Sequence, residues 1–137
     1  MKHVVAVLAL ACLLIGLAMS ASGADQVTTV PVHFGQAGGS THFNGQFAGY
    51  DSVHYTLAAQ PGQTMTVKLS GSGRAGFNVY KPGDEPGSAT AIGSGGIGSD
   101  WSGRLPAGGE YIVQVYQMRA SARRGGQVDF GIDMGLH

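Results

Sequence analysis

Regular alternation of apolar and polar residues runs through most of the chain and limits what it can fold into. Segment 127–134 places an apolar residue at every second position, and segment 64–70 repeats the pattern. Successive side chains of a β-strand point to opposite faces, so this alternation gives each strand one face on a core and one in water. No segment after residue 25 shows the apolar spacing of a long amphipathic helix. The alternation predicts an all-β protein.

The expected strands are short and evenly spaced, which is typical of an antiparallel sandwich. They are separated by turn residues, and all except 102–105 contain β-branched or aromatic residues: 27–34, 40–47, 52–59, 64–70, 77–80, 102–105, 110–118 and 127–134. We therefore predict a small antiparallel β-sandwich of about eight strands. The Gly- and Ser-rich region 82–103 is predicted to be a long, mobile loop, in which Trp101 is either a core residue or a partner contact.

The first 24 residues have the features of a signal peptide. A basic start at Lys2 is followed by an apolar run over 4–17 and by small residues at 22–24. The run is shorter than the roughly 20 residues that a membrane span needs. We predict export by residues 1–24, a single β-sandwich domain over 25–137, and no membrane insertion after cleavage. The alternative is a lipoprotein acylated at Cys12.

Composition excludes several functions for residues 25–137. Without Lys2 the chain carries one more acidic than basic residue, so there is no overall positive field for nucleic acid. Cys12 is the sole cysteine and no GxSxG motif is present, which leaves a hydrolase unsupported. Two GxGxxG matches, at 71–76 and 93–98, do not open helices. No metal or cofactor is expected, because the remaining histidines lack metal-ligand spacing: His33, His42, His54 and His137.

An arginine-rich segment, 118–126, separates the last two predicted strands. If Arg119–Arg123 forms a helical turn, those two arginines lie on one face and Arg124 points elsewhere, while Gly125 ends the turn. The planar guanidinium binds carboxylates and phosphates at two points, so the pair suits an anionic partner. The alternative is a solvated loop that keeps a hairpin soluble.

Tyr50 is a second candidate, because it lies between a glycine and Asp51 just before a predicted strand. Tyrosine is favoured at protein interfaces. The alternative is a core or corner tyrosine whose hydroxyl caps a loop.

A set of short motifs in one order resembles the periplasmic inhibitors of goose-type (g-type) lysozyme. The more specific motifs are Gly-Tyr-Asp at 49–51 and Arg-x-x-x-Arg at 119–123; Gly-Gln at 62–63, Val-Tyr-Lys-Pro-Gly at 79–83 and Leu-Pro-Ala-Gly-Gly-Glu-Tyr at 105–111 accompany them. The Leu-Pro-Ala-Gly turn is shared with other exported β-sandwiches, including pre-peptidase C-terminal modules. The glycine-rich tract 88–102 does not fit the resemblance.

The resemblance implies a non-enzymatic β-sandwich that blocks the active-site cleft of a g-type lysozyme and protects peptidoglycan in the periplasm. In that family a tyrosine and two arginines enter the cleft, and by motif these fall on Tyr50, Arg119 and Arg123. Neighbouring Asp51, Ser121 and Arg124 are secondary contact candidates. The alternative function is a pre-peptidase-C-like module that binds glycan or an envelope protein.

Overall fold

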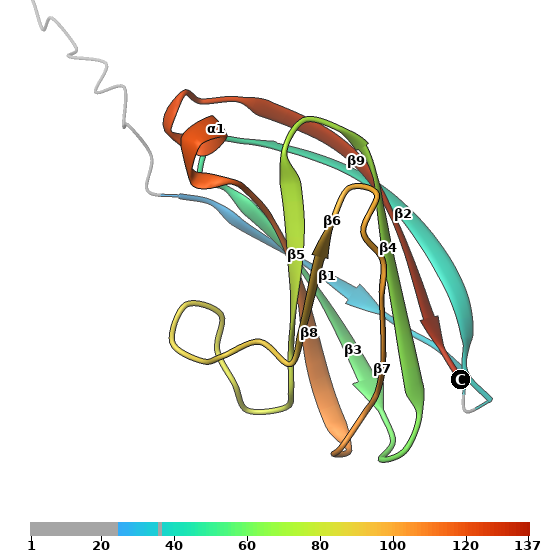
Figure 1. Cartoon of the computed structure of the whole chain (residues 1–137). Helices are drawn as coiled ribbons and strands as arrows, with labels where there is room; N and C mark the ends of the chain where they lie inside the picture. Colours follow the sequence, from blue (N-terminus) through green and yellow to red (C-terminus); the bar gives the residue numbers. More distant parts are fainter. Residues whose placement is uncertain (1–24, 36) are drawn as a thin grey trace, which may run out of the picture.

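The computed structural model describes residues 25–35 and 37–137, and this part of the chain is built almost entirely of strands (Figure 1). The predicted signal peptide, 1–24, and Cys12 lie outside the described residues. The elements are β1 (Val27–Val32), β2 (Gly39–Ala48), β3 (Ser52–Ala59), β4 (Thr64–Ser72), β5 (Ala75–Tyr80), β6 (Gly93–Gly96), β7 (Trp101–Arg104), β8 (Gly109–Gln117), α1 (Arg119–Arg123) and β9 (Gln127–Leu136). Within the described ranges, no helix has the length and apolarity needed to cross a membrane.

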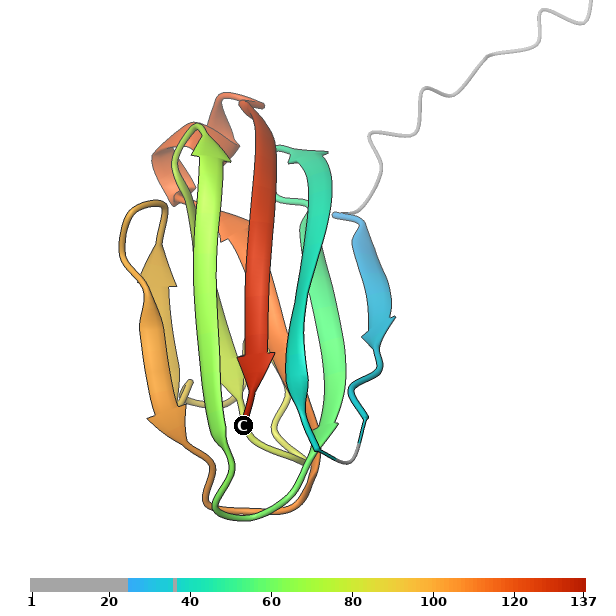
Figure 2. The same cartoon turned by 90° about the vertical axis from the view of Figure 1, so that its right-hand side faces the viewer.

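The strands form two sheets that pack face to face, which confirms the predicted sandwich (Figure 2). One sheet has the order β1-β3-β8-β5-β6 and the other β2-β9-β4-β7. Two details differ from the prediction. The described residues form nine strands rather than about eight. The pairing of β1 with β3 is parallel, because β1 lies beside β3 rather than beside its neighbour in sequence, β2.

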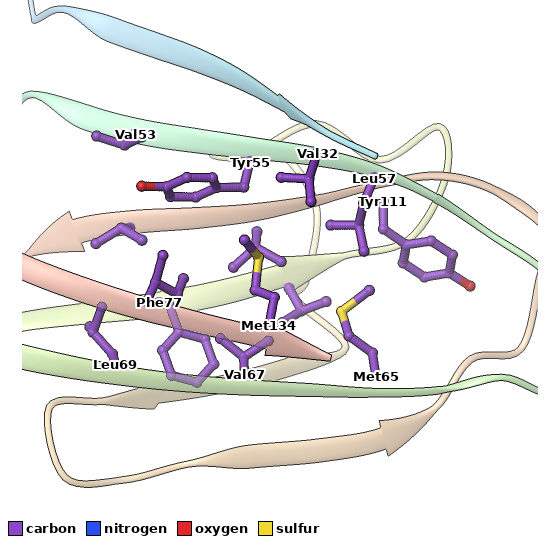
Figure 3. Packing of buried hydrophobic residues seen from close by; sticks show 14 of the residues in the cluster. Val32, Val53, Tyr55, Leu57, Met65, Val67, Leu69, Phe77, Tyr111 and Met134 are labelled. Atoms are coloured by element: carbon purple, nitrogen blue, oxygen red, sulfur yellow. The ribbon is translucent and has the colours of Figure 1, made fainter. Parts of the chain in front are cut away.

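The core lies between the sheets and is made by the alternating apolar residues. Figure 3 shows Tyr55 and Leu57 of β3 facing Val67 of β4 across this layer. Phe77 and Ile132 have no exposed surface. Burying an aliphatic or aromatic side chain contributes about 1.5–3 kcal/mol, so the packing of these strands supplies most of the stability.

The glycine-rich region 82–103 was predicted to be a mobile loop, and this was wrong for 93–96, which form β6 and pair with β5. The strand predicted at 102–105 is confirmed as β7, which pairs with β4. Glycines make room here for Trp101: a Cβ atom added at Gly93 or Gly103 would collide with its ring. Trp101 is only half-exposed and packs against the core. The high glycine content therefore has a packing cause, and alternation cannot reveal it because glycine has no side chain.

Three connections cross between the sheets at one end of the sandwich. They join β2 to β3, β4 to β5, and β8 to β9 through α1. Both Figure 1 and Figure 2 place α1 and the β4–β5 turn at the same end, opposite the C-terminus. The hairpin assumed in the alternative interpretation of 118–126 is not formed, because β8 and β9 lie in different sheets about 10 Å apart. The segment between β8 and β9 therefore bridges the two sheets instead of closing a hairpin within one.

His42 forms a small polar cluster on the outer face of the four-stranded sheet. Its Nδ1 lies 2.8 Å from Asp133 Oδ1, and its Nε2 lies 3.0 Å from Asn44 Oδ1. The hydrogen bonds to Asp133 and then to Asn44 raise the pKa of His42 above its usual 6.5. His54, on the other sheet, has its pKa lowered by burial. At low pH, protonation of His42 therefore stabilises the folded state and protonation of His54 destabilises it.

The His42 cluster predicts a pH-dependent contribution to stability. A histidine with a raised pKa in the folded state stabilises fully below pH of about 6.5, and this contribution is lost as pH rises through the folded pKa. The loss of unfolding free energy caused by His42→Gln should therefore be larger at pH 5.5 than at pH 8, measured by urea unfolding. His33→Gln, at an exposed histidine outside the cluster, is the matched control. An equal loss for His42→Gln at both pH values would contradict this assignment.

Candidate functional site

The arginine-rich segment folds as the short helix α1, which confirms the predicted helical turn. Ala120 and Ala122 favour helix, and Gly125 ends it with a φ of 68°. The N–H of Gly125 donates to the carbonyl of Ala122 at 2.9 Å, and the N–H of Gly126 donates to that of Ser121 at 3.0 Å. These two bonds form a Schellman motif, which satisfies carbonyls at the end of the helix.

The burial of Ala122 sets the direction of the arginines. Ala122 is 3% exposed and faces the sandwich, whereas all three arginines are exposed. At 3.6 residues per turn, Arg119 and Arg123 lie about 40° apart around the helix axis, and Arg124 lies about 100° beyond Arg123. The first two therefore share a side of α1 and Arg124 does not, as predicted.

Tyr50 lies in the turn that connects β2 to β3. The turn is closed by the N–H of Asp51, which donates to the carbonyl of Ala48 at 3.1 Å. Gly49 allows it with a φ of 60°. Tyr50 is 49% exposed, so it is not a core residue. Tyr111, not Tyr50, is the corner tyrosine whose hydroxyl caps a loop: its hydroxyl donates to the carbonyl of Ala107 at 2.7 Å.

A buried amide, that of Gln117, holds the Tyr50 turn against the α1 connection. Its Nε2 donates to the carbonyl of Gly126 at 2.7 Å and to that of Gly49 at 3.2 Å. The N–H of Gly49 also donates to the carbonyl of Gly126 at 2.9 Å. Tyr50 and the helix are thus attached to one rigid junction, although they are far apart in sequence.

Tyr50 and Arg119 line the same depression on the surface, which has a volume of about 400 Å³. Its floor includes Tyr116 and Gln114 of β8 and Tyr80 of β5. The five-stranded sheet therefore adds aromatic and amide groups beside the two predicted residues. Arg123 does not line this depression and extends the site along α1 instead.

The three secondary candidates have different surroundings. The Asp51 carboxylate accepts the N–H of Gln26 at 2.8 Å, so it holds the start of the described chain beside β3. Ser121 is half-buried and its carbonyl accepts the N–H of Gly126, as above. Arg124 is the exposed C-cap of α1. Asp51 and Ser121 therefore have roles within the fold, and Arg124 is free to meet solvent or a partner.

Electrostatics at this end are dominated by arginine. Among the described residues, the only ion pair is His42–Asp133, far from α1, so the arginines have no carboxylate partner within this part of the chain. No group of three or more His, Cys, Asp or Glu residues suited to a metal ion occurs in the same ranges. The site can therefore form charge-assisted hydrogen bonds with an anionic partner.

Sequence reasoning missed several residues of this site. Gln117, Tyr80 and Tyr116 reach it through the pairing of β8 with β3 and β5. Gln117 offered one signal, since it is an amide at an apolar position of the alternating β8 pattern.

Comparison with known proteins gives related sequences and structures, although no family model matches the chain. An inhibitor of g-type lysozyme from Escherichia coli (strain K12) is 32% identical over 124 residues, covering 90% of this chain and 92% of that protein. The crystal structure of PliG from Aeromonas hydrophila, a periplasmic lysozyme inhibitor of g-type lysozyme, is 54% identical with a TM-score of 0.79, covering 83% of this chain and 100% of that one. A PliG mutant from Escherichia coli is 26% identical with a TM-score of 0.61, covering 82% and 99%.

Removing the Gln117 amide should loosen the junction that holds the site. Gln117→Ala leaves the Gly49 carbonyl without its side-chain donor and removes one of the two donors to the Gly126 carbonyl. Leaving a buried group of this kind unsatisfied costs about 1–3 kcal/mol. The expected result is a lower unfolding free energy in urea titrations. Gln114→Ala, on the opposite face of β8 and without a hydrogen bond of this kind, is the control. Equal stability of the two variants would show that the junction does not depend on this amide.

Proposed function

This chain belongs to the family of g-type lysozyme inhibitors, and we propose on that basis that it blocks the active-site cleft of a g-type lysozyme with Tyr50, Arg119 and Arg123. The relatives that establish the family are inhibitors rather than enzymes, and the solved ones are described as periplasmic. The inhibitor acts in the periplasm, where it protects peptidoglycan. The leader over 1–24 supplies the export route in this proposal.

One observation carries the proposal: a rigid junction presents Tyr50 and the arginine face of α1 together at one end of the sandwich. The Gln117 amide joins their two connections. Tyr50 and both arginines are exposed, and neither arginine is engaged by a carboxylate of the described residues. Such preorganisation favours binding because few side-chain and loop movements are lost on association.

The chemistry of the three side chains suits an acidic cleft. Glycoside hydrolases act through carboxyl groups that flank the bond they cleave. The guanidinium groups of Arg119 and Arg123 pair with such carboxylates in planar, two-point contacts. Hydrogen bonds to charged groups contribute about 1.5–3 kcal/mol each. Tyr50 adds an aromatic anchor beside them, of the kind enriched at binding hot spots.

The alternative, a pre-peptidase-C-like module that binds glycan or an envelope protein, is not favoured. The relatives that match most of the chain at 32% and 54% identity are lysozyme inhibitors.

Replacing both arginines should abolish most of the inhibition. With about 1.5–3 kcal/mol lost per arginine, Arg119→Ala/Arg123→Ala should raise the inhibition constant at least about a hundredfold. Tyr50→Ala should also weaken inhibition by removing the anchor. The measurement is lysis of peptidoglycan by a g-type lysozyme with the chain lacking residues 1–24. The matched control is Arg104→Ala. Arg104 is the last residue of β7 and lies at the end of the sandwich opposite α1.

The controls separate the function from the site. Circular dichroism and thermal unfolding must show that each variant remains folded. A folded double variant that inhibits as well as the unmodified protein would overturn the assignment of the arginines. An unmodified protein that inhibits chicken-type or invertebrate-type lysozyme but not a g-type enzyme would overturn the proposed function.

A further inference from the structure

We propose that Arg74 is a third cationic contact of the inhibitory site, directed at carboxylates on the rim of the lysozyme cleft. The inference rests on the proposed function and extends it to a residue from another part of the chain. Arg74 lies in the β4–β5 turn, within the GxGxxG match at 71–76. That motif has no phosphate-binding role in this fold, because β5 follows it rather than a helix.

Backbone contact places Arg74 beside the start of α1. Its carbonyl accepts the N–H of Met118 at 2.9 Å, and Met118 directly precedes Arg119. Close packing is possible because Gly76 has no side chain. The Cε of Met118 and the hydroxyl of Tyr116 each lie 3.1 Å from the position that a Gly76 Cβ would occupy. The β4–β5 turn and the N-terminus of α1 therefore form one continuous surface.

The turn that carries Arg74 is short and conformationally restricted. Only Gly73 and Arg74 separate β4 from β5. Gly73 has a φ of 92°, and a Cβ there would lie 3.3 Å from Cγ2 of Val128. Arg74 is exposed. Its backbone is thus fixed while its side chain remains available, as at Arg119 and Arg123.

Charge at this end of the sandwich favours an acidic partner. Four arginines are exposed on its connections: Arg74, Arg119, Arg123 and Arg124. Carboxylates at this end include that of Asp51, which already accepts the N–H of Gln26, and that of Asp129, which pairs in register with Ser72 beside the β4–β5 turn. Within the described residues none of the four arginines is in an ion pair. An excess of unpaired positive charge attracts acidic surfaces and raises association rates.

Apolar groups lie among these charges. Among the described residues, the exposed large hydrophobic side chains are Val27, Tyr50 and Met118. Met118 is 42% exposed. Its N–H donates to the Arg74 carbonyl, and Arg119 follows it in the sequence, so Met118 lies between the two arginines. An apolar side chain at this position excludes water from neighbouring charged contacts, which strengthens them. The contact surface therefore reaches from Tyr50 across α1 to the β4–β5 turn.

The test compares arginine substitutions at the two ends of the sandwich. The dissociation constant for a g-type lysozyme is measured at low and high salt by surface plasmon resonance. Arg74→Ala should weaken binding about tenfold and reduce its salt dependence, because a rim charge acts on association. Arg74→Glu should weaken binding more strongly through repulsion, and Arg74→Lys should retain part of the affinity. Arg104→Ala should stay within about twofold of the unmodified protein.

The outcomes separate this inference from the proposed function. If the folded Arg74→Ala and Arg74→Glu variants bind like the unmodified protein while Arg119→Ala binds weakly, Arg74 is not a contact and the proposed function stands. An equal loss in Arg74→Ala and Arg104→Ala would also overturn the inference, because it would reflect net charge alone. If the unmodified protein binds no g-type lysozyme, the proposed function fails, and the inference fails with it.

Discussion

The separation of the two sheets determines where this chain can carry function. Each strand buries one face, so the sheets pack about 10 Å apart and most side chains are committed either to the core or to a flat outer face. Three connections must bridge that distance at one end, and each exposes side chains that neither sheet engages. Tyr50, Arg74 and α1 all lie on these crossings. The proposed binding end of the molecule is thus a consequence of how the sandwich is connected.

A crossing segment is useful for binding only if it holds its shape. Gln117 provides this, because one buried amide donates to carbonyls of two different connections. The Schellman motif at Gly125 and Gly126 fixes the far end of α1 in the same way. These polar bonds lie at the margin of the core, where apolar contacts alone could not specify the position of a turn. The result is a set of exposed arginines on a backbone that needs little reorganisation on association.

The sequence predicted what local patterns encode and missed what long-range pairing creates. Alternation identified most strands, and the four-residue spacing of Arg119 and Arg123 identified the shared side of α1. The parallel pairing of β1 with β3 was not predictable, because strand order leaves no trace in period-two alternation. β6 was hidden because it has glycines where close packing needs them: Gly93 accommodates Trp101, and Gly95 accommodates Phe77. The places of Arg74 and Gln117 beside the site depend on contacts with residues far away in the sequence. The Arg74 carbonyl accepts the N–H of Met118, and the Gln117 amide donates to the Gly49 carbonyl.

The positions of the chain ends have a practical consequence for attaching the protein to surfaces or labels. Gln26 is hydrogen-bonded to Asp51 and Ser52, immediately after Tyr50. His137 pairs with Thr64 through two backbone bonds at the opposite end of the sandwich. A fluorophore or affinity tag joined after His137 extends away from the arginines and leaves the end with Tyr50 and α1 open. The same group joined before Gln26 competes for space with an enzyme of the size of a lysozyme. The C-terminus is therefore the end from which the protein is best immobilised.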